Sequence, residues 1–344
     1  MAKTDEDRRL DPRIKAMLST VEVGVGNNYT NREEMLTRAS SEEARAAAVK
    51  RDAFLDMYDT EEIAPSTGLT TTIREITSAP DGNTIKLQII SHDSGESLPC
   101  VYYIHGGGMA EGSCTWGNYK AWGRIVASFG VNVVMVDFRN YLTPSSVPEV
   151  APYPAGLNDC VSGLKWTHDN ATSLGIDPSK IVVAGESGGG NLALATGLKL
   201  LRDGDINLVA GLYSLCPYIA GKWPQEKLPS STENNGILVN LHSNAARVGY
   251  GIEAFNARDP LAWPHFASEA DVKGLPPVVI SVNECDPLRD EGIEFYRLLL
   301  AADQPARCRQ LMGMIHGVEV LHCCPDISKD TARDLAGFCI DSGS

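Results

Sequence analysis

The stretch IVVAGESGGGNLALATGLKLL, residues 181–201, decides how the rest of the chain is interpreted. A short apolar run leads into a serine among glycines, and apolar residues at helical spacing follow. Glycines between a strand and a helix can cradle a phosphate, form a plain tight turn, or lift one side chain into a site. Gly185-Glu186-Ser187-Gly188-Gly189 fits G-x-S-x-G, the pattern of a nucleophile elbow, in which the serine occupies a strained turn.

The other two interpretations of this stretch have less support. A phosphate-binding loop of the G-x-x-x-x-G-K-[ST] type needs a lysine that is absent here, and G-x-G-x-x-G is not matched either. The second interpretation, a glycine-rich turn that carries no chemistry, cannot be decided from this stretch alone. If the elbow is correct, the following helix directs its free N–H groups and the positive end of its dipole at the oxygen of a tetrahedral intermediate.

Hydrophobic periodicity predicts the fold class. Residues 71–77 and 83–91 alternate like half-buried strands, with a turn at Pro80-Asp81-Gly82 between them. Short continuous apolar runs, separated by helical patterns, then predict buried parallel strands, with a last strand at about 306–311. These runs occupy residues 100–105, 131–138, 181–185, 208–215 and 277–282. We therefore expect an α/β fold with a mostly parallel central sheet flanked by helices.

Two segments stand outside this alternation. Residues 1–69 carry helical patterns and are expected to form a helical segment before the domain at 70–344. Residues 218–264 are rich in proline, serine and asparagine, with a weak helical pattern around 239–255. Loops of that length in compact domains are usually lids or mobile segments, so we expect a long loop or an insertion that covers something.

A second glycine motif, His105-Gly106-Gly107-Gly108, lies at the end of the predicted strand 100–105. In serine hydrolases of this architecture, such a loop lends backbone N–H groups to the oxyanion hole. Glycine suits this role because the acyl oxygen must approach the main chain closely. A turn that merely contains three glycines is the alternative, but the pairing with a downstream G-x-S-x-G is much rarer by chance.

A serine nucleophile needs a base, and the base needs an acid to orient it. In α/β-hydrolases the acid and then the histidine follow the serine. Among the histidines after Ser187, His316 follows the predicted last strand, where a base should project over the carboxyl edge of the sheet. The others fall in or beside the irregular segment or among cysteine and leucine residues; they are His242, His265 and His322.

The acid is expected directly after the strand at 277–282. Asp286 precedes Pro287 and so lies in a turn at the end of that strand, which makes it the preferred candidate, with Glu284 in reserve. Asp290 and Glu291 fall in the first turn of the next helix, where acids commonly serve only the dipole.

Two other motifs are interpreted as coincidences. Ser162-Gly163-Leu164-Lys165 matches S-x-x-K, but it lies in the middle of an amphipathic helix without the companion motifs. His92-Asp93-Ser94 contains the residue types of a triad, but neighbours in one turn cannot adopt its geometry. No H-E-x-x-H occurs, and neither a metal nor a cofactor is expected.

Composition narrows the partners. The formal net charge is −14, which disfavours nucleic acid or an anionic membrane surface. The polar N-terminus shows no secretory signal, and no apolar run approaches the roughly 18 residues of a membrane span. Nine cysteines without a C-x-x-C favour reduced thiols in a cytoplasm. We expect a cytoplasmic protein with a small-molecule partner, and a homodimer is left open.

Four motifs in order resemble the hormone-sensitive-lipase group of esterases, bacterial family IV, over residues 98–321. They are HGGG at 105–108, GESGGGN at 185–191, DPLRDEG at 286–292 and MIHG at 314–317. The resemblance implies an α/β-hydrolase fold and a cap built from the N-terminal helices and the insertion at about 218–264. It also implies Ser187 as nucleophile, Asp286 as acid and His316 as base, with Gly107, Gly108 and Gly188 supplying the oxyanion N–H groups.

The chain departs from the family pattern at three places. Gly188 stands where alanine is usual and Glu186 where aspartate is commoner, and both changes are expected to be mild. The run at 138–154 replaces the usual Y-R-L-A-P-E, with Arg139 aligned, and is expected to reshape one wall of the pocket.

The resulting expectation is a carboxylic ester hydrolase that acts on short-to-medium acyl esters through an acyl-enzyme. Two alternatives remain: an amidase or a deacetylase of acylated small molecules with the same triad, and a small-molecule receptor on this fold. Receptors of that kind lose the base, and the presence of His316 argues against this alternative.

Overall fold

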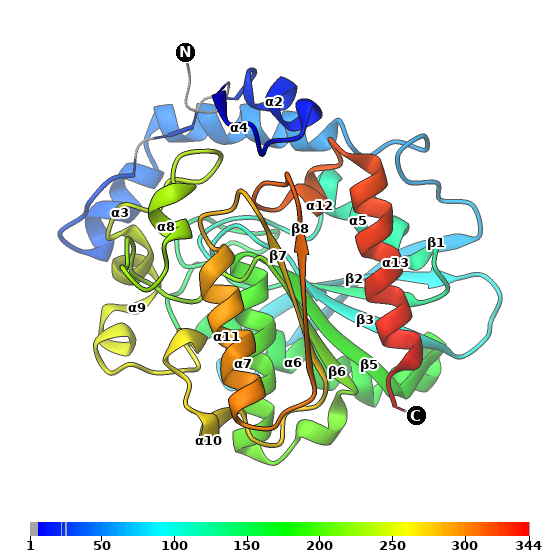
Figure 1. The fold of residues 1–344 in the computed structure, drawn as a ribbon. Coiled ribbons are helices and arrows are strands. Elements are labelled where there is room, and N and C mark those ends of the chain that lie inside the picture. Colours follow the sequence, from blue (N-terminus) through cyan, green and yellow to red (C-terminus); the bar gives the residue numbers. More distant parts are fainter. Residues whose placement is uncertain (1–5, 22, 25, 344) are drawn as a thin grey trace.

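The computed structural model of the protein describes residues 6–21, 23–24 and 26–343. Its centre is a twisted eight-stranded sheet in the order β1-β2-β4-β3-β5-β6-β7-β8 (Figure 1). β1 pairs antiparallel with β2 and β2 with β4, and all other pairs are parallel. The strands are β1 (Leu69–Thr77), β2 (Thr84–His92), β3 (Leu98–Ile104), β4 (Asn132–Asp137), β5 (Ile176–Glu186), β6 (Gly211–Leu215), β7 (Val278–Asn283) and β8 (Ala306–Leu311).

Every strand predicted from the apolar runs is present, and the expected fold class is confirmed. β4, β6 and β7 are buried along their whole length, as expected for strands covered on both faces. β1 is largely exposed at the edge of the sheet, where its alternating sequence TTIREIT fits a half-solvated strand.

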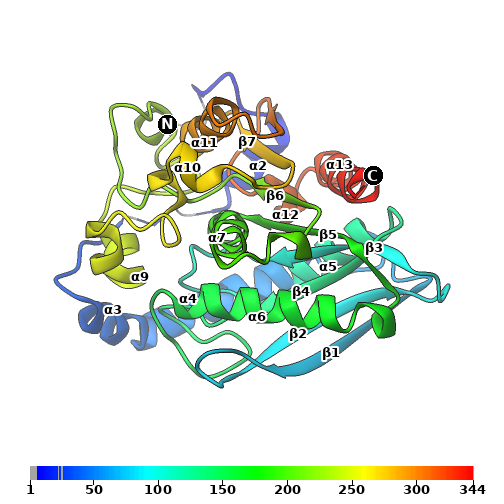
Figure 2. The same cartoon turned by 90° about the horizontal axis from the view of Figure 1, so that it is seen from below.

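Helices cover both faces of the sheet (Figures 1 and 2). α5 (Gly117–Ala127) and α13 (Pro325–Asp341) pack together on one face, where Trp122 and Leu335 belong to the same buried cluster. The other face carries α6 (Ala155–Asp169), α7 (Gly188–Asp203) and α11 (Arg289–Ala301), which contribute to a second, larger cluster. Short helices in the connections are η1 (Ala171–Leu174), η2 (Ile206–Leu208), η3 (Pro264–Phe266), α10 (Glu269–Val272) and α12 (Val318–Leu321).

The two segments outside the alternation lie next to each other. The N-terminal part forms α2 (Pro12–Leu18), α3 (Arg32–Ala39) and α4 (Glu42–Asp56), drawn in blue in Figure 1. The segment at 218–264 contains α8 (Ser230–Glu233) and α9 (Ala245–Asn256), the latter overlapping the weak helical pattern at 239–255. α3 contacts α9, and the backbone N–H of Tyr29 donates to the side chain of Asn244.

Among the helices of the described residues, none combines the length and the hydrophobicity that a membrane span requires.

Candidate active site

Ser187 occupies the sharp turn between β5 and α7. Its φ of +56° is in the left-handed region, an unfavourable conformation for a residue with a side chain. Glycine is required on both sides, because a Cβ at Gly185 would lie 2.3 Å from the carbonyl oxygen of Gly189, and one at Gly189 would lie 2.0 Å from that of Ile104. The strained serine turn expected from the motif is therefore present.

A continuous chain of hydrogen bonds joins the three residues expected to form the triad. The Ser187 hydroxyl lies 2.8 Å from Nε2 of His316, and Nδ1 of His316 lies 2.8 Å from a carboxylate oxygen of Asp286. With a proton on Nδ1, the imidazole donates to Asp286 and accepts from Ser187. The second carboxylate oxygen of Asp286 accepts the backbone N–H of Leu288. Each residue follows a parallel strand, so the shared carboxyl edge brings the three together.

The surroundings of His316 favour its protonated form. Burial of the imidazole lowers its pKa, but the charge and hydrogen bond of Asp286 together with Cys216 outweigh burial, and the pKa of His316 lies well above its ordinary value. Asp286 itself is fully buried. An imidazole that gains a proton readily is suited to accept one from a hydroxyl held 2.8 Å away.

The backbone N–H groups of Gly107, Gly108 and Gly188 donate no hydrogen bond within the described part of the chain. Gly107 and Gly108 have φ values of +95° and +64°, and a Cβ on Gly107 would lie 2.0 Å from the carbonyl oxygen of Glu111. Glycine is therefore needed at 107 for both conformation and space. Both glycines line the same cavity as Ser187, so free donors are available beside its hydroxyl.

The replacement of alanine by Gly188 is not the mild change expected from the sequence. A Cβ at this position would lie 2.5 Å from the backbone nitrogen of Met109 and 2.8 Å from Cα of Gly108. The loop at 105–109 thus packs directly on the first turn of α7. The motif did not predict this contact, because it concerns only the backbone donor of Gly188 and not the space beside that residue.

Glu186 also has a role that the sequence did not reveal. Its buried carboxylate accepts hydrogen bonds from the hydroxyls of Tyr119 at 2.6 Å and Tyr103 at 2.8 Å. The Tyr119 hydroxyl in turn accepts the N–H of Gly106 at 2.9 Å, so the carboxylate supports the glycine loop through one tyrosine. Burial raises the pKa of Glu186 to about 7 against the lowering effect of the two hydroxyls. No local sequence signal connects α5 with the elbow.

Ser187 and His316 open into a cavity of about 620 Å³. Arg51 and Leu55 of α4 form part of its wall, and so does the stretch at 238–241 from the insertion. A second cavity of about 870 Å³ lies under α3 and α4 and shares Arg51, Glu111 and Trp116 with the first. Arg51 forms an ion pair with Glu111, and its guanidinium lies 4.5 Å from the ring centroid of Trp116. These three side chains therefore separate the two cavities.

The other histidine and acid candidates lie elsewhere or have other partners. His242 contacts the carbonyl oxygen of Ser231, and His322 donates to that of Asn118, with burial lowering the pKa of His322 to about 4. Glu284 accepts the N–H of Gly313 and does not contact His316 in the described structure. His265 lies against the ring of Phe266.

The two motifs interpreted as coincidences form ordinary structural contacts. The Ser162 hydroxyl accepts the backbone N–H of Ala79, while Lys165 pairs with Asp205. His92 donates to the carbonyl oxygen of Ala127.

Glu291 and Arg139, two charged residues of the sequence motifs, form buried contacts that hold parts of the fold together. The expectation that Glu291 serves only the helix dipole is incomplete, because its buried carboxylate accepts hydrogen bonds from Ile219, Ala220 and Trp223. It thereby fixes the start of the insertion. Arg139 is buried and pairs with Asp159 and Asp81, which anchors the start of the atypical run at 138–154, and residues 142–145 of this run line the second cavity.

Cys216 completes a group of possible metal ligands with Asp286 and His316, with one ligand atom from each lying within 4.8 Å of the others. Asp286 and His316 already bond to each other, and burial raises the pKa of the Cys216 thiol to about 12. We therefore assign Asp286 and His316 to the serine–histidine–aspartate arrangement rather than to a metal site.

The strand order, the strained serine and the hydrogen-bonded histidine and aspartate together define an α/β-hydrolase. The family described as alpha/beta hydrolase fold matches residues 101–320, more than half of the chain, and the chain belongs to that family.

Proteins named as esterases resemble the chain over most of its length. The carboxylesterase NlhH of Mycobacterium tuberculosis is 35% identical over 248 residues, which cover 71% of this chain and 74% of that protein. A solved structure of the esterase Est22 with p-nitrophenol is 62% identical, covers 98% of this chain and 100% of its own, and superposes with a TM-score of 0.96.

The structure of brefeldin A esterase, described as a bacterial homologue of human hormone-sensitive lipase, is 35% identical. It covers 98% of this chain and 95% of its own, with a TM-score of 0.84. The resemblance inferred from the four motifs is thus confirmed, and the chain is an enzyme of the esterase class.

Proposed function

We propose that the protein hydrolyses carboxylic esters of short-to-medium acyl length, with Ser187 as nucleophile, His316 as base and Asp286 as the orienting acid. The observation that carries this proposal is the unbroken chain of hydrogen bonds from Asp286 through His316 to Ser187, at the wall of a cavity with free backbone donors. The esterases that resemble this chain in sequence and in fold support the same reaction class.

The reaction follows from this geometry in two halves. Nε2 of His316 takes the hydroxyl proton as Oγ of Ser187 bonds to the ester carbonyl carbon, and the carbonyl oxygen becomes an oxyanion. The free N–H groups of Gly107, Gly108 and Gly188 stabilise that charge. Asp286 keeps the proton of His316 on Nδ1 and stabilises the imidazolium that forms.

Collapse of the tetrahedral intermediate breaks the bond to the alcohol oxygen, which leaves with the proton held on His316. Water then gives a proton to His316 and attacks the acyl-enzyme, and a second collapse releases the carboxylic acid and returns the proton to Ser187. Atoms and charges balance over the cycle, and no metal or cofactor enters it.

We further propose that residues 1–69 and the insertion at about 218–264 form a cap over the domain at 70–344. α4 and residues 238–241 contribute wall residues to the cavity, and α3 contacts α9, which supports a common unit. A cavity of about 620 Å³ bounded by these elements favours short-to-medium acyl groups over long ones.

The nine cysteines, none in a disulfide, support a reducing compartment such as the cytoplasm.

Labelling with a fluorophosphonate probe and p-nitrophenyl ester kinetics test the proposal together. Folded parent protein should be labelled at Ser187, and Ser187→Ala should lose both labelling and roughly 10⁴-fold or more of kcat on p-nitrophenyl acetate. Ser162→Ala is the matched control, because this serine belongs to the S-x-x-K motif in α6 and should leave both unchanged. A folded Ser187→Ala variant with the parent rate would show that the nucleophile is misassigned.

A further inference from the structure

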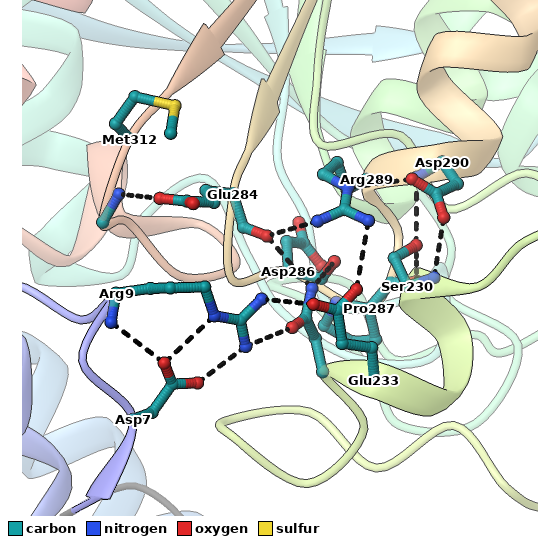
Figure 3. A network of polar contacts seen from close by, with 12 residues as sticks. Asp7, Arg9, Ser230, Glu233, Glu284, Asp286, Pro287, Arg289, Asp290 and Met312 are labelled. Atoms are coloured by element: carbon teal, nitrogen blue, oxygen red, sulfur yellow. Dashed lines mark hydrogen bonds and ion pairs between the residues drawn. The ribbon is translucent and has the colours of Figure 1, made fainter.

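The loop at 284–288, which carries Asp286, is held from outside the sheet by a network of polar side chains (Figure 3). The side chain of Asn234, directly after α8, lies fully buried against this loop. Its amide nitrogen donates to the backbone carbonyls of Glu284 and Asp286, at 3.0 Å each. One amide therefore joins two carbonyls of this loop, each of which also accepts a hydrogen bond from Arg289: Glu284 from its guanidinium and Asp286 from its backbone N–H.

The N-terminal segment fixes the orientation of this amide. The Arg9 guanidinium donates to the side-chain oxygen of Asn234 at 3.0 Å and to the carboxylates of Glu233 and Asp7. An Asn234 amide turned the other way would place its NH₂ against the guanidinium and its oxygen against two carbonyls. Arg9 thus selects the orientation that can hold the loop, and Asp7 holds Arg9 in turn.

Contacts with the N-terminal segment extend to the loop that carries His316. The backbone N–H of Asp11 donates to the carbonyl of Gly313, and the N–H of Gly313 donates to the side chain of Glu284. An apolar cluster supports the same contact, with the α2 residue Ile14 fully buried. Its members include Leu10, Ile14 and Leu18 of the N-terminal segment, Cys285, Met314 and Ile315 of the two loops, and Val318 at the start of α12.

We propose that Asn234, held in place by Arg9, is a positioning residue that sets the distance between Asp286 and His316. The proposal rests on the function proposed above. Asn234 contacts only the backbone of the loop, and so it acts through Asp286 rather than on substrate. The N-terminal segment would thus be required for an aligned triad and not only for a covered site.

Replacement of Asn234 should change the pH dependence of kcat, which a loss of stability alone would not do. The charge of Asp286 raises the pKa of His316, so a looser contact between them lowers that pKa. The other ionisable groups that act on His316 are Cys216, Glu186 and Glu319, which lie on different elements and are left in place. The pH at which kcat falls on the acid side should therefore move to lower pH.

The test measures kcat, KM and the pH profile of kcat with p-nitrophenyl acetate for Asn234→Leu, which keeps the branched shape of the side chain but has neither a donor nor an acceptor. We expect kcat to fall roughly tenfold, KM to change less than about twofold, and the acid limb to shift to lower pH. Arg9→Ala is the second variant, with a smaller change in the same direction. Arg8→Ala is its matched control, because Arg8 is exposed and its substitution removes the same charge.

A folded Asn234→Leu variant with the parent kcat and the parent acid limb would overturn the proposal. If that variant does not fold, Arg9→Ala decides, and a profile identical to that of Arg8→Ala would overturn it as well. Fluorophosphonate labelling of the parent separates this outcome from failure of the proposed function, because an unlabelled parent would refute the triad whatever Asn234 does.

Discussion

Tyr119 and Glu186 share a hydrogen bond of 2.6 Å directly behind the glycine loop, and the same tyrosine hydroxyl accepts the N–H of Gly106. A residue of α5 therefore links the residue before the nucleophile to the loop that supplies the oxyanion donors. Since oxyanion stabilisation depends on donors held in place before reaction, this link should matter for rate more than for substrate binding.

Tyr119→Phe should lower kcat on p-nitrophenyl acetate roughly tenfold with little change in KM. The substitution leaves the N–H of Gly106 without its acceptor and lets the loop move. Tyr103→Phe is the matched control, because it removes the other hydrogen bond to Glu186 without touching the loop. Equal losses of kcat in the two variants would contradict a specific role of Tyr119.

Glu186 should make the protein less stable as pH rises from about 4.5 to about 7. Burial raises the pKa of this carboxyl from 4.5 to about 7, so the folded state binds its proton more tightly than the unfolded state. The resulting stabilisation is complete below pH 4.5 and is lost by about pH 7, on the order of 3 kcal/mol. Urea unfolding at pH 5 and pH 8 should show a smaller difference for Glu186→Gln than for the parent; equal differences would refute this assignment.

The rate should show the opposite dependence on pH. His316 acts as a base only when neutral, so kcat/KM should rise with pH through a pKa that Asp286 raises well above the ordinary histidine value. Asp286→Asn should lower kcat/KM about 10⁴-fold and move the acid limb to lower pH. Glu284→Gln, at the reserve acid, should have a far smaller effect. A larger loss from Glu284→Gln would exchange the two assignments.

Gly188→Ala should lower kcat, although it introduces the residue that the family resemblance leads one to expect at this position. Gly188 has helical backbone angles that alanine adopts readily, so the added Cβ acts only through its contact with Met109 and Gly108. We expect a loss of roughly tenfold in kcat as the loop is pushed from the serine. Gly337→Ala in α13 is the control, because nothing lies within 4 Å of the added atom. A Gly188→Ala variant with the parent kcat would show that the loop adapts.

Removal of the partition between the two cavities should extend the range of substrates. Arg51→Ala deletes the side chain that pairs with Glu111 over Trp116, and so should join the catalytic cavity to the larger one. The ratio of kcat/KM for p-nitrophenyl octanoate to that for the acetate should rise roughly tenfold. Arg45→Ala, which lines only the larger cavity, should leave the ratio unchanged. An unchanged ratio in Arg51→Ala would refute the partition.

Much of the fold and of the candidate site could be predicted because the responsible signals are local. The apolar runs marked the parallel strands since a strand buried on both faces needs apolar residues throughout. Gly185 and Gly189 marked the turn since no larger residue fits there. Asp286 and His316 could be selected by order along the chain and by their place after a strand, because the carboxyl ends of parallel strands meet at one edge.

Local signals along the chain were enough to predict the strands, the elbow and the candidates for the triad, because chain geometry and steric limits act over a few residues. The distant residues that hold that triad in place could be identified only from the packing of the folded chain. Arg9 meets Asn234, Tyr119 meets Glu186, and Gly188 meets Met109 across long separations in the chain. These contacts depend on how the helices and loops pack, and a hydrogen bond or a steric limit between such residues leaves no periodicity in the sequence.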